Sequence, residues 1–350
     1  MTSLLSRHAE CAFWLARYLE RAESMARILE AHVAFSRGRT GENSWGWIIA
    51  LYSDDNDFFS KHSEANAENV IGYYVTQLEN LSSIQGSIRA ARENARALRA
   101  LIPTDMWMQL NDFYARLLAF TKSDFSEMRL SRTCDTIKRG CYAEMGVAES
   151  TLYRDESWPF FRLGLFIERA DQTSRLLDVQ FAQRAAGMAA LSPEQEAGFW
   201  NVLLRSASAY HSFRRVYPSG LKPADVAHFL SFDTRLPRSI TFCAAEIQRM
   251  ISQLRGEFRL RNAQRAFEIS DAFLTGLRMS SRDEHLSSRL HDFNDGVQTE
   301  LIRLTAELGN SFFGHQIAEP PPQKPSQAPL DPSSFIQSQS QRSSGLQTQG

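Results

Sequence analysis

Two segments of the chain repeat one pattern of charged and apolar residues. Residues 18–29 read YLERAESMARIL and residues 166–177 read FIERADQTSRLL, so Glu-Arg-Ala-acid occurs twice, 148 residues apart, each time with an arginine four residues after the acid. Apolar residues recur at i, i+3 and i+4 through both segments, which is the spacing of one helix face. The repetition predicts two equivalent helices in two halves of one all-α fold.

The remainder of the chain also follows helical periodicity, and alternation typical of β-strands is nearly absent. Its breaks are short, as between packed antiparallel helices. We therefore predict one multi-helix bundle over residues 1–316, with pseudo-repeated halves of about 1–150 and 151–316. Further helices are expected over residues 63–81, 83–101, 105–120, 124–152, 194–213, 237–254, 261–278 and 283–313.

The composition changes abruptly near residue 316. Residues 317–350 are rich in Pro, Gln and Ser and contain few apolar side chains. Such a segment cannot bury enough surface to offset the entropy of ordering its backbone. We predict a disordered C-terminal tail.

Charge, hydropathy and cysteine spacing argue against several classes of protein. The chain has 39 basic and 40 acidic residues, which argues against a protein that coats nucleic acid through charge. No uninterrupted apolar run approaches the roughly 18 to 20 residues of a membrane-spanning helix. The four cysteines form no CxxC pair, which disfavours a zinc site or a disulfide framework. The sequence predicts a cytoplasmic protein with reduced thiols, with no metal, cofactor, membrane or nucleic-acid partner.

The repeated segments supply the first candidate site. Each contains an acid-to-arginine pair at i, i+4, and on a solvated face such pairs would only stabilise the helix slightly. Phe13 and Phe161 fall on the glutamate side, however, so these helices are apolar on two sides and belong at the centre of a bundle. A buried glutamate needs a partner, and arginine is the natural one. We expect an internal network, either architectural or lining a cleft, formed by Glu20, Arg21, Glu23, Arg27, Glu168, Arg169, Asp171 and Arg175.

A second candidate is the arginine-rich segment 87–101, SIRAARENARALRAL. Its arginines share one helix face and would repel each other unless anionic groups meet them. They either pair with Glu20, Glu23, Glu168 or Asp171 from other helices, or bind a carboxylate or phosphate. The arginines are Arg89, Arg92, Arg96 and Arg99.

The third candidate is the segment 232–240, FDTRLPRSI. Pro237 is placed to fix a helix start. Ser239, with nearby backbone N–H groups, either caps this helix or receives an anion there. No Glu-x-x-His, GxxxxGK[ST], GxGxxG, HExxH or GxSxG motif occurs, so the sequence contains no recognised catalytic motif.

Four stretches in order resemble the alpha-E domain family, a group of bacterial all-helical proteins with a Glu-Arg signature. They are SLLSRHAECAFWLARYLERAESMARIL, IRAARENARALR, LFIERADQTSRLLD and FRRVYPSGLKPADVAHFLSFDTRLPRS. The signature pairs are Glu20–Arg21 and Glu168–Arg169. The other residues that match the family pattern are Arg92, Glu93, Asn94, Arg96, Asp233, Pro237, Arg238 and Ser239.

The resemblance also implies a functional context. Family members are typically encoded or fused with a circularly permuted ATP-grasp protein, and often with a transglutaminase-like peptidase. ATP-grasp proteins form amide bonds through acyl phosphates, so the resemblance implies an accessory role in peptide or amide synthesis or modification. Two alternatives stay open at this level: an enzyme that uses Glu20 or Glu168 as general acid or base, and a purely structural helical protein.

Overall fold

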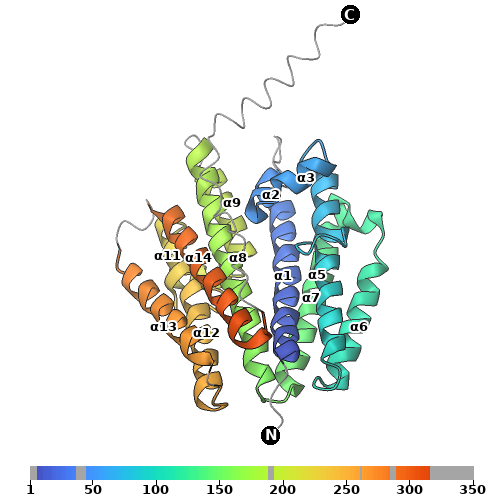
Figure 1. Cartoon of the computed structure of the whole chain (residues 1–350). Helices are drawn as coiled ribbons and strands as arrows, with labels where there is room; N and C mark the ends of the chain where they lie inside the picture. Colours follow the sequence, from blue (N-terminus) through green and yellow to red (C-terminus); the bar gives the residue numbers. More distant parts are fainter. Residues whose placement is uncertain (1–5, 37–44, 188–192, 261, 284–288, 316–350) are drawn as a thin grey trace, which may run out of the picture.

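The computed structural model describes residues 6–36, 45–187, 193–260, 262–283 and 289–315. These residues fold into α-helices with short π and 3₁₀ segments and no strand, which confirms the all-α class (Figure 1). The predicted tail at residues 317–350 lies outside the described residues. Within the described part of the chain, no helix is long and apolar enough to cross a membrane.

Two long helices form the centre of the bundle. The helices α1 (Ser6–Ser36) and α8 (Ser157–Gly187) have 31 residues each and contain the two repeated segments. They pack against each other along the middle of the molecule (Figure 1). A Cβ atom at Gly164 of α8 would collide with the carbonyl oxygen of Phe13 in α1, so a glycine is required where the two backbones approach closely.

The first half of the chain surrounds α1. The helices α5 and α7 pack directly on α1, and α6 packs on both α5 and α7. The elements of this half are α2 (Gly46–Tyr52), α3 (Asp55–Lys61), α4 (Ala67–Ile71) with a π-helical continuation Gly72–Thr76, α5 (Ile84–Ala97), α6 (Thr104–Leu118), a 3₁₀ turn Lys122–Phe125 and α7 (Glu127–Thr151).

The second half surrounds α8 on the opposite side (Figure 1). The helices α12 and α14 pack on α8, α13 packs on α12, and α9 reaches back to contact α1. The elements are α9 (Pro193–Ser206), α10 (Tyr210–Val216), α11 (Pro223–Phe232), α12 (Ile240–Gly256), α13 (Ala263–Ser280) and α14 (Leu290–Leu308) with a π-helical end Gly309–Phe313.

Several expected boundaries were wrong. The helix expected over residues 194–213 divides into α9 and α10, because Ser208 adopts a left-handed backbone conformation with φ 54°. The helix expected over 63–81 spans only residues 67–76, and α2, α3 and α11 were not expected at all. These three helices have seven to ten residues, too few for a clear periodic pattern. The equivalence of the two halves stays a prediction from the sequence.

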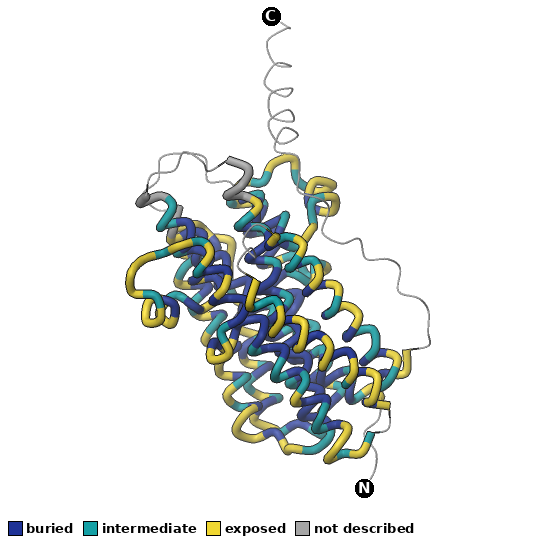
Figure 2. Tube along the Cα trace, turned by 90° about the vertical axis from the view of Figure 1, so that its left-hand side faces the viewer, coloured by how far each residue is buried: buried dark blue, intermediate teal, exposed yellow. Residues whose placement is uncertain are grey.

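Burial follows the helix faces that point towards the centre (Figure 2). Phe13 and Phe161 are buried on the glutamate side of α1 and α8, as their positions predicted. Both central helices are therefore enclosed on two sides. Because of this enclosure, charged groups at the α1–α8 contact are withdrawn from solvent.

Candidate functional site

The two Glu-Arg pairs meet reciprocally at the contact between α1 and α8. Arg21 of α1 binds Glu168 of α8 through two parallel hydrogen bonds of 2.6 and 3.0 Å. Arg169 of α8 approaches Glu20 of α1, with 3.0 Å between Nε and Oε2. Each signature glutamate thus faces the signature arginine of the other helix. The network expected between the two halves is formed, and it separates into two clusters.

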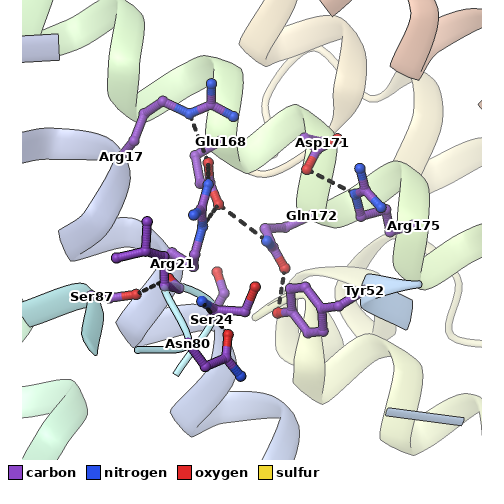
Figure 3. A network of polar contacts seen from close by, with 12 residues as sticks. Arg17, Arg21, Ser24, Tyr52, Asn80, Ser87, Glu168, Asp171, Gln172 and Arg175 are labelled. Carbon is purple, nitrogen blue, oxygen red and sulfur yellow. Dashed lines mark hydrogen bonds and ion pairs between the residues drawn. The ribbon is translucent and has the colours of Figure 1, made fainter. Parts of the chain in front are cut away.

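The Glu168 cluster consists of Arg17, Arg21, Tyr52, Glu168 and Gln172 (Figure 3). Arg17 donates from Nε to Glu168 Oε2 at 2.8 Å, and Gln172 donates to Oε1 at 3.2 Å. Tyr52 from α2 in turn donates to the amide oxygen of Gln172 at 2.8 Å. Glu168 has 0% exposure, and both of its oxygens accept hydrogen bonds.

The electrostatics of this cluster keep Glu168 ionised. Burial would raise the pKa of Glu168, but the charges and hydrogen bonds of Arg21 and Arg17 outweigh burial and lower its pKa to about 2. Burial also opposes the charge on Arg21, yet Glu168 raises the pKa of that arginine above its usual value. A carboxylate held this firmly in its ionised form is a poor general acid or base near neutral pH.

The predicted i, i+4 pairs are both formed. Arg175 donates to Asp171 at 2.9 Å, beside the Glu168 cluster (Figure 3). Arg27 donates to Glu23 on α1. The first pair stays within α8, whereas the second joins a larger group of charges.

The Glu20 cluster consists of Glu20, Glu23, Arg27, Tyr142, Arg169 and Arg238. Arg238, from the turn before α12, places Nη2 2.6 Å from Glu20 Oε1 and 2.5 Å from Glu23 Oε2. Tyr142 of α7 donates to Glu23 Oε1 at 2.9 Å and accepts from Arg27 at 2.6 Å. Three helices, α1, α7 and α8, and the turn before α12 thus contribute to this cluster.

A cavity of about 120 Å³ adjoins the Glu20 cluster. Burial and the nearby charge of Arg238 lower the pKa of Arg27 to about 10, the opposite direction to Arg21 in the other cluster. Arg27 remains charged at neutral pH. The cavity is lined by Leu19, Glu20, Glu23, Cys141, Tyr142, Met145, Arg169 and Arg238.

The arginine face of α5 does not meet these acids, so the pairing considered from the sequence was wrong. Arg89 donates to the carbonyl of Leu78 at 2.7 Å, and Arg92 donates to Asn111 at 2.6 Å and lies over the Trp107 ring. The face points past α1 towards α6, because the apolar side of α5 packs on α1. Of the other residues on this helix, Arg96 pairs with Glu93, Arg99 donates to Thr104, and Asn94 donates to the carbonyl of Ala90.

The segment before α12 forms a helix cap. Ser239 accepts from the N–H of Phe242 at 3.0 Å and donates to the carbonyl of Asp233. The Asp233 side chain accepts from the backbone N–H groups of Arg235 and Leu236. This turn orients Arg238 towards α1, so its role is to deliver that arginine to the Glu20 cluster.

A histidine between two aspartates is a further titratable group. His291 of α14 lies 2.7 Å from Asp178 through Nδ1 and 3.5 Å from Asp295 through Nε2. The hydrogen bond that the His291 ring donates to the Asp178 carboxylate raises the pKa of His291. Because both ring nitrogens face carboxylates, a protonated imidazole satisfies this group without a metal ion.

Sequence reasoning missed four members of the two clusters: Arg17, Tyr52, Tyr142 and Gln172, the last of which lies within the second repeated segment. Arg17 has no counterpart in the second segment, where Leu165 occupies the matching position. Tyr52 and Tyr142 lie in segments that carry no recognisable motif. The i, i+4 spacing of Arg17 and Arg21 was the one available signal.

The Alpha-E family, described as a predicted alpha-helical domain with a conserved ER motif, matches residues 4–313. The chain belongs to the Alpha-E family. The family's ER motif is the dipeptide Glu-Arg, which occurs in both repeated segments. The reciprocal pairs Glu20–Arg169 and Arg21–Glu168 are therefore contacts between two copies of this dipeptide.

Curated relatives of this Alpha-E chain are uncharacterized proteins. One from Mycobacterium bovis is 24% identical over 324 residues, which cover 86% of this chain and 35% of the relative. One from Mycobacterium tuberculosis strain H37Rv is 23% identical with the same coverage. The chain thus spans about a third of the length of these relatives. No solved structure matches the chain.

Proposed function

We propose that this Alpha-E domain is a helical accessory module of an amide-forming system. Its partner would be a circularly permuted ATP-grasp ligase, with a transglutaminase-like peptidase as a possible third component, acting in the cytoplasm on peptide or amide substrates. The family resemblance supports the choice of an ATP-grasp partner. The observation that carries the proposal is that relatives contain this domain within chains about three times as long.

The geometry favours a binding module over an enzyme that uses Glu168. Glu168 is fully buried, doubly paired with arginines and low in pKa, so it fixes α8 against α1 and cannot exchange protons with a substrate. The Glu168 cluster thus serves as architecture. This rigid centre holds the outer helices in place for a partner.

The exposed arginines of α5 form the docking surface of the proposal. Arg96 is 68% exposed, and Arg99, which follows the C-terminal end of the same helix, is exposed too. Arg99 donates to Thr104 at the start of α6. A surface of exposed arginines suits an acidic patch on a partner protein.

The test is a crosslinked pull-down of the tagged full chain from its native cytoplasm. Wild type is compared with Arg96→Ala/Arg99→Ala and with a control, Arg129→Ala/Arg139→Ala, which removes exposed arginines from α7. We expect an ATP-grasp protein to co-purify with wild type and control, and to be depleted at least fivefold with the α5 variant. Circular dichroism confirms that all three are helical. Absence of an ATP-grasp protein from every sample, or no effect of the domain on ligase turnover, contradicts the proposal.

A further inference from the structure

The cavity beside the Glu20 cluster has the size, charge and lining of a ligand site. We propose that it binds a small carboxylate, either a free short-chain acid or the C-terminal carboxylate of a peptide. The carboxylate group would contact Arg169 and Arg238, and its apolar part would lie against Leu19 and Met145. This proposal does not depend on the ATP-grasp partnership.

Charge is the first argument. The Glu20 cluster contains three guanidinium groups, on Arg27, Arg169 and Arg238, and two carboxylates, on Glu20 and Glu23. One positive charge is therefore left without a matching acid inside the cluster. The Glu168 cluster, with Arg17 and Arg21 on one carboxylate, has the same surplus, but the surplus at Glu20 borders a cavity. The lowered pKa of Arg27, to which Arg238 contributes, is consistent with this surplus. A single monovalent anion would neutralise it.

Hydrogen-bonding capacity is the second argument. Arg169 lines the cavity, and its buried Nε has an ion-pair contact with Glu20 but no partner in hydrogen-bond geometry among the described residues. Buried polar atoms in proteins are ordinarily hydrogen-bonded, so this N–H donor marks where an acceptor on a ligand completes the cluster. Arginine is well suited to a carboxylate because its planar fork can donate two parallel bonds.

The size and the lining of the cavity indicate which class of anion it would bind. A volume of about 120 Å³ corresponds to about four water molecules of about 30 Å³ each. Leu19, Cys141 and Met145 form the uncharged part of the wall. Burial raises the pKa of the Cys141 thiol, so it is neutral at physiological pH. A carboxylate with a short apolar chain matches both parts of this lining better than inorganic phosphate does.

The site can be tested by methyl NMR on the full chain, since Met145 borders the cavity and is one of nine methionines. Met145→Leu assigns the Met145 methyl signal, and propionate is then titrated into methyl-labelled wild type. We expect this signal to shift saturably, while the exposed Met128 and Met279 stay unchanged. A wild-type titration with no saturable shift at Met145 overturns the proposal.

Variants identify the groups that bind. By calorimetry, Arg169→Gln should weaken propionate binding at least tenfold, whereas Arg175→Gln on the same helix should leave it unchanged, because Arg175 is bonded to Asp171 outside the cavity. Met145→Phe fills the cavity without changing charge and should abolish binding even if Arg169→Gln fails to fold. Unchanged binding to folded Arg169→Gln or to Met145→Phe overturns the site.

Matched ligands identify the chemistry. N-acetylalanine binding as tightly as propionate supports a peptide C-terminus as the source, and binding of propionate alone supports a free acid. Tighter binding of inorganic phosphate than of any carboxylate overturns the carboxylate assignment. Saturable binding of ethylammonium in place of propionate overturns the anion assignment altogether.

Discussion

Glu168 and Glu20 occupy matching positions in the two repeated segments, yet one is sealed between helices and the other borders a cavity. The difference begins with neighbouring side chains. Arg17 and Gln172 both bond to Glu168, and the positions that match them in the other segment hold Leu165 and Ser24. Leu165 has no polar group to donate across to Glu20, and Ser24, which lies on the same helix as Glu20, has a shorter side chain than Gln172.

The two clusters therefore obtain their partners from different parts of the fold. Around Glu168, the two arginines and Gln172 come from α1 and α8, and Tyr52 from α2 completes the network. Around Glu20, the second arginine comes from the turn before α12, and Tyr142 comes from α7. Similar sequence segments can thus support a closed structural contact on one side and an accessible polar site on the other, depending on what packs beside them.

The largest expected difference is between Glu168→Gln and Glu20→Gln. Glu168→Gln leaves two largely enclosed arginines, 11% and 17% exposed, without a carboxylate and should lower the free energy of unfolding by about 3 to 5 kcal/mol. Glu20→Gln should cost about 1 to 2 kcal/mol, because Arg238 keeps Glu23 and water can enter the cavity. Urea unfolding measures both. Equal losses would mean that the two clusters do not differ in enclosure.

Glu144 of α7 is a third buried carboxylate, and its surroundings differ from those of Glu168 and Glu20. It has 0% exposure, and neither oxygen has a hydrogen-bond partner among the described residues. Burial raises its pKa from 4.5 to about 8, so the folded state retains a proton that the unfolded state releases. Its contribution to stability is complete below about pH 4.5 and is lost as pH rises towards 8.

Glu144→Gln should remove this loss of stability between about pH 4.5 and 8, because glutamine does not titrate. At pH 8 the variant should be more stable than wild type by about 2 to 4 kcal/mol, since one pKa unit corresponds to about 1.4 kcal/mol. At pH 4.5 the two should be equally stable. Glu168 has the opposite sign: its pKa is lowered, so its contribution is complete above about pH 4.5 and is lost as pH falls towards 2. Chemical unfolding across this pH range tests both directions, and a wild-type-like pH profile for Glu144→Gln would contradict the assignment.

Gly164→Ala tests the close approach of α1 and α8 on which both clusters depend. The added methyl group collides with the Phe13 carbonyl and should cost about 1 to 3 kcal/mol through overpacking. Gly146→Ala on α7 is the control, because a Cβ there meets no atom within 4 Å. The control should gain about 0.5 to 1 kcal/mol from helix propensity. Thermal unfolding of the pair gives the comparison, and similar melting temperatures would rule out a tight contact.

The smallest expected effects separate the two tyrosines. Tyr52→Phe removes the donor to Gln172 inside the Glu168 cluster and should cost about 1 kcal/mol. Tyr142 is 49% exposed, so water can replace its hydroxyl group and Tyr142→Phe should cost less than about 0.5 kcal/mol. Denaturant midpoints measured side by side resolve this difference. A larger loss for Tyr142→Phe would mean that the Glu20 cluster is the more tightly enclosed of the two.

Local patterns in the sequence were sufficient for the fold class and for the burial of the signature glutamates. Phe13 and Phe161 placed apolar surface on the glutamate side, and this alone indicated central helices and arginine partners. The short helices α2, α3 and α11 escaped prediction because helical periodicity needs several turns to show. Of the two alternatives considered for the arginines of α5, pairing with the acids of α1 and α8 was wrong, because the spacing of the arginines defines a face but not the direction in which it points.

By itself, the sequence determined that this chain is helical, that two matching helices lie at its centre and that their glutamates need arginines. Periodicity and charge pairing act over a few residues, so they can be recognised without coordinates. Only the tertiary structure decided that Arg21 meets Glu168, that Arg238 reaches Glu20 from the turn before α12, and that a cavity remains on that side. These contacts join residues more than a hundred positions apart, and they depend on the rotation and packing of whole helices, which no local pattern specifies.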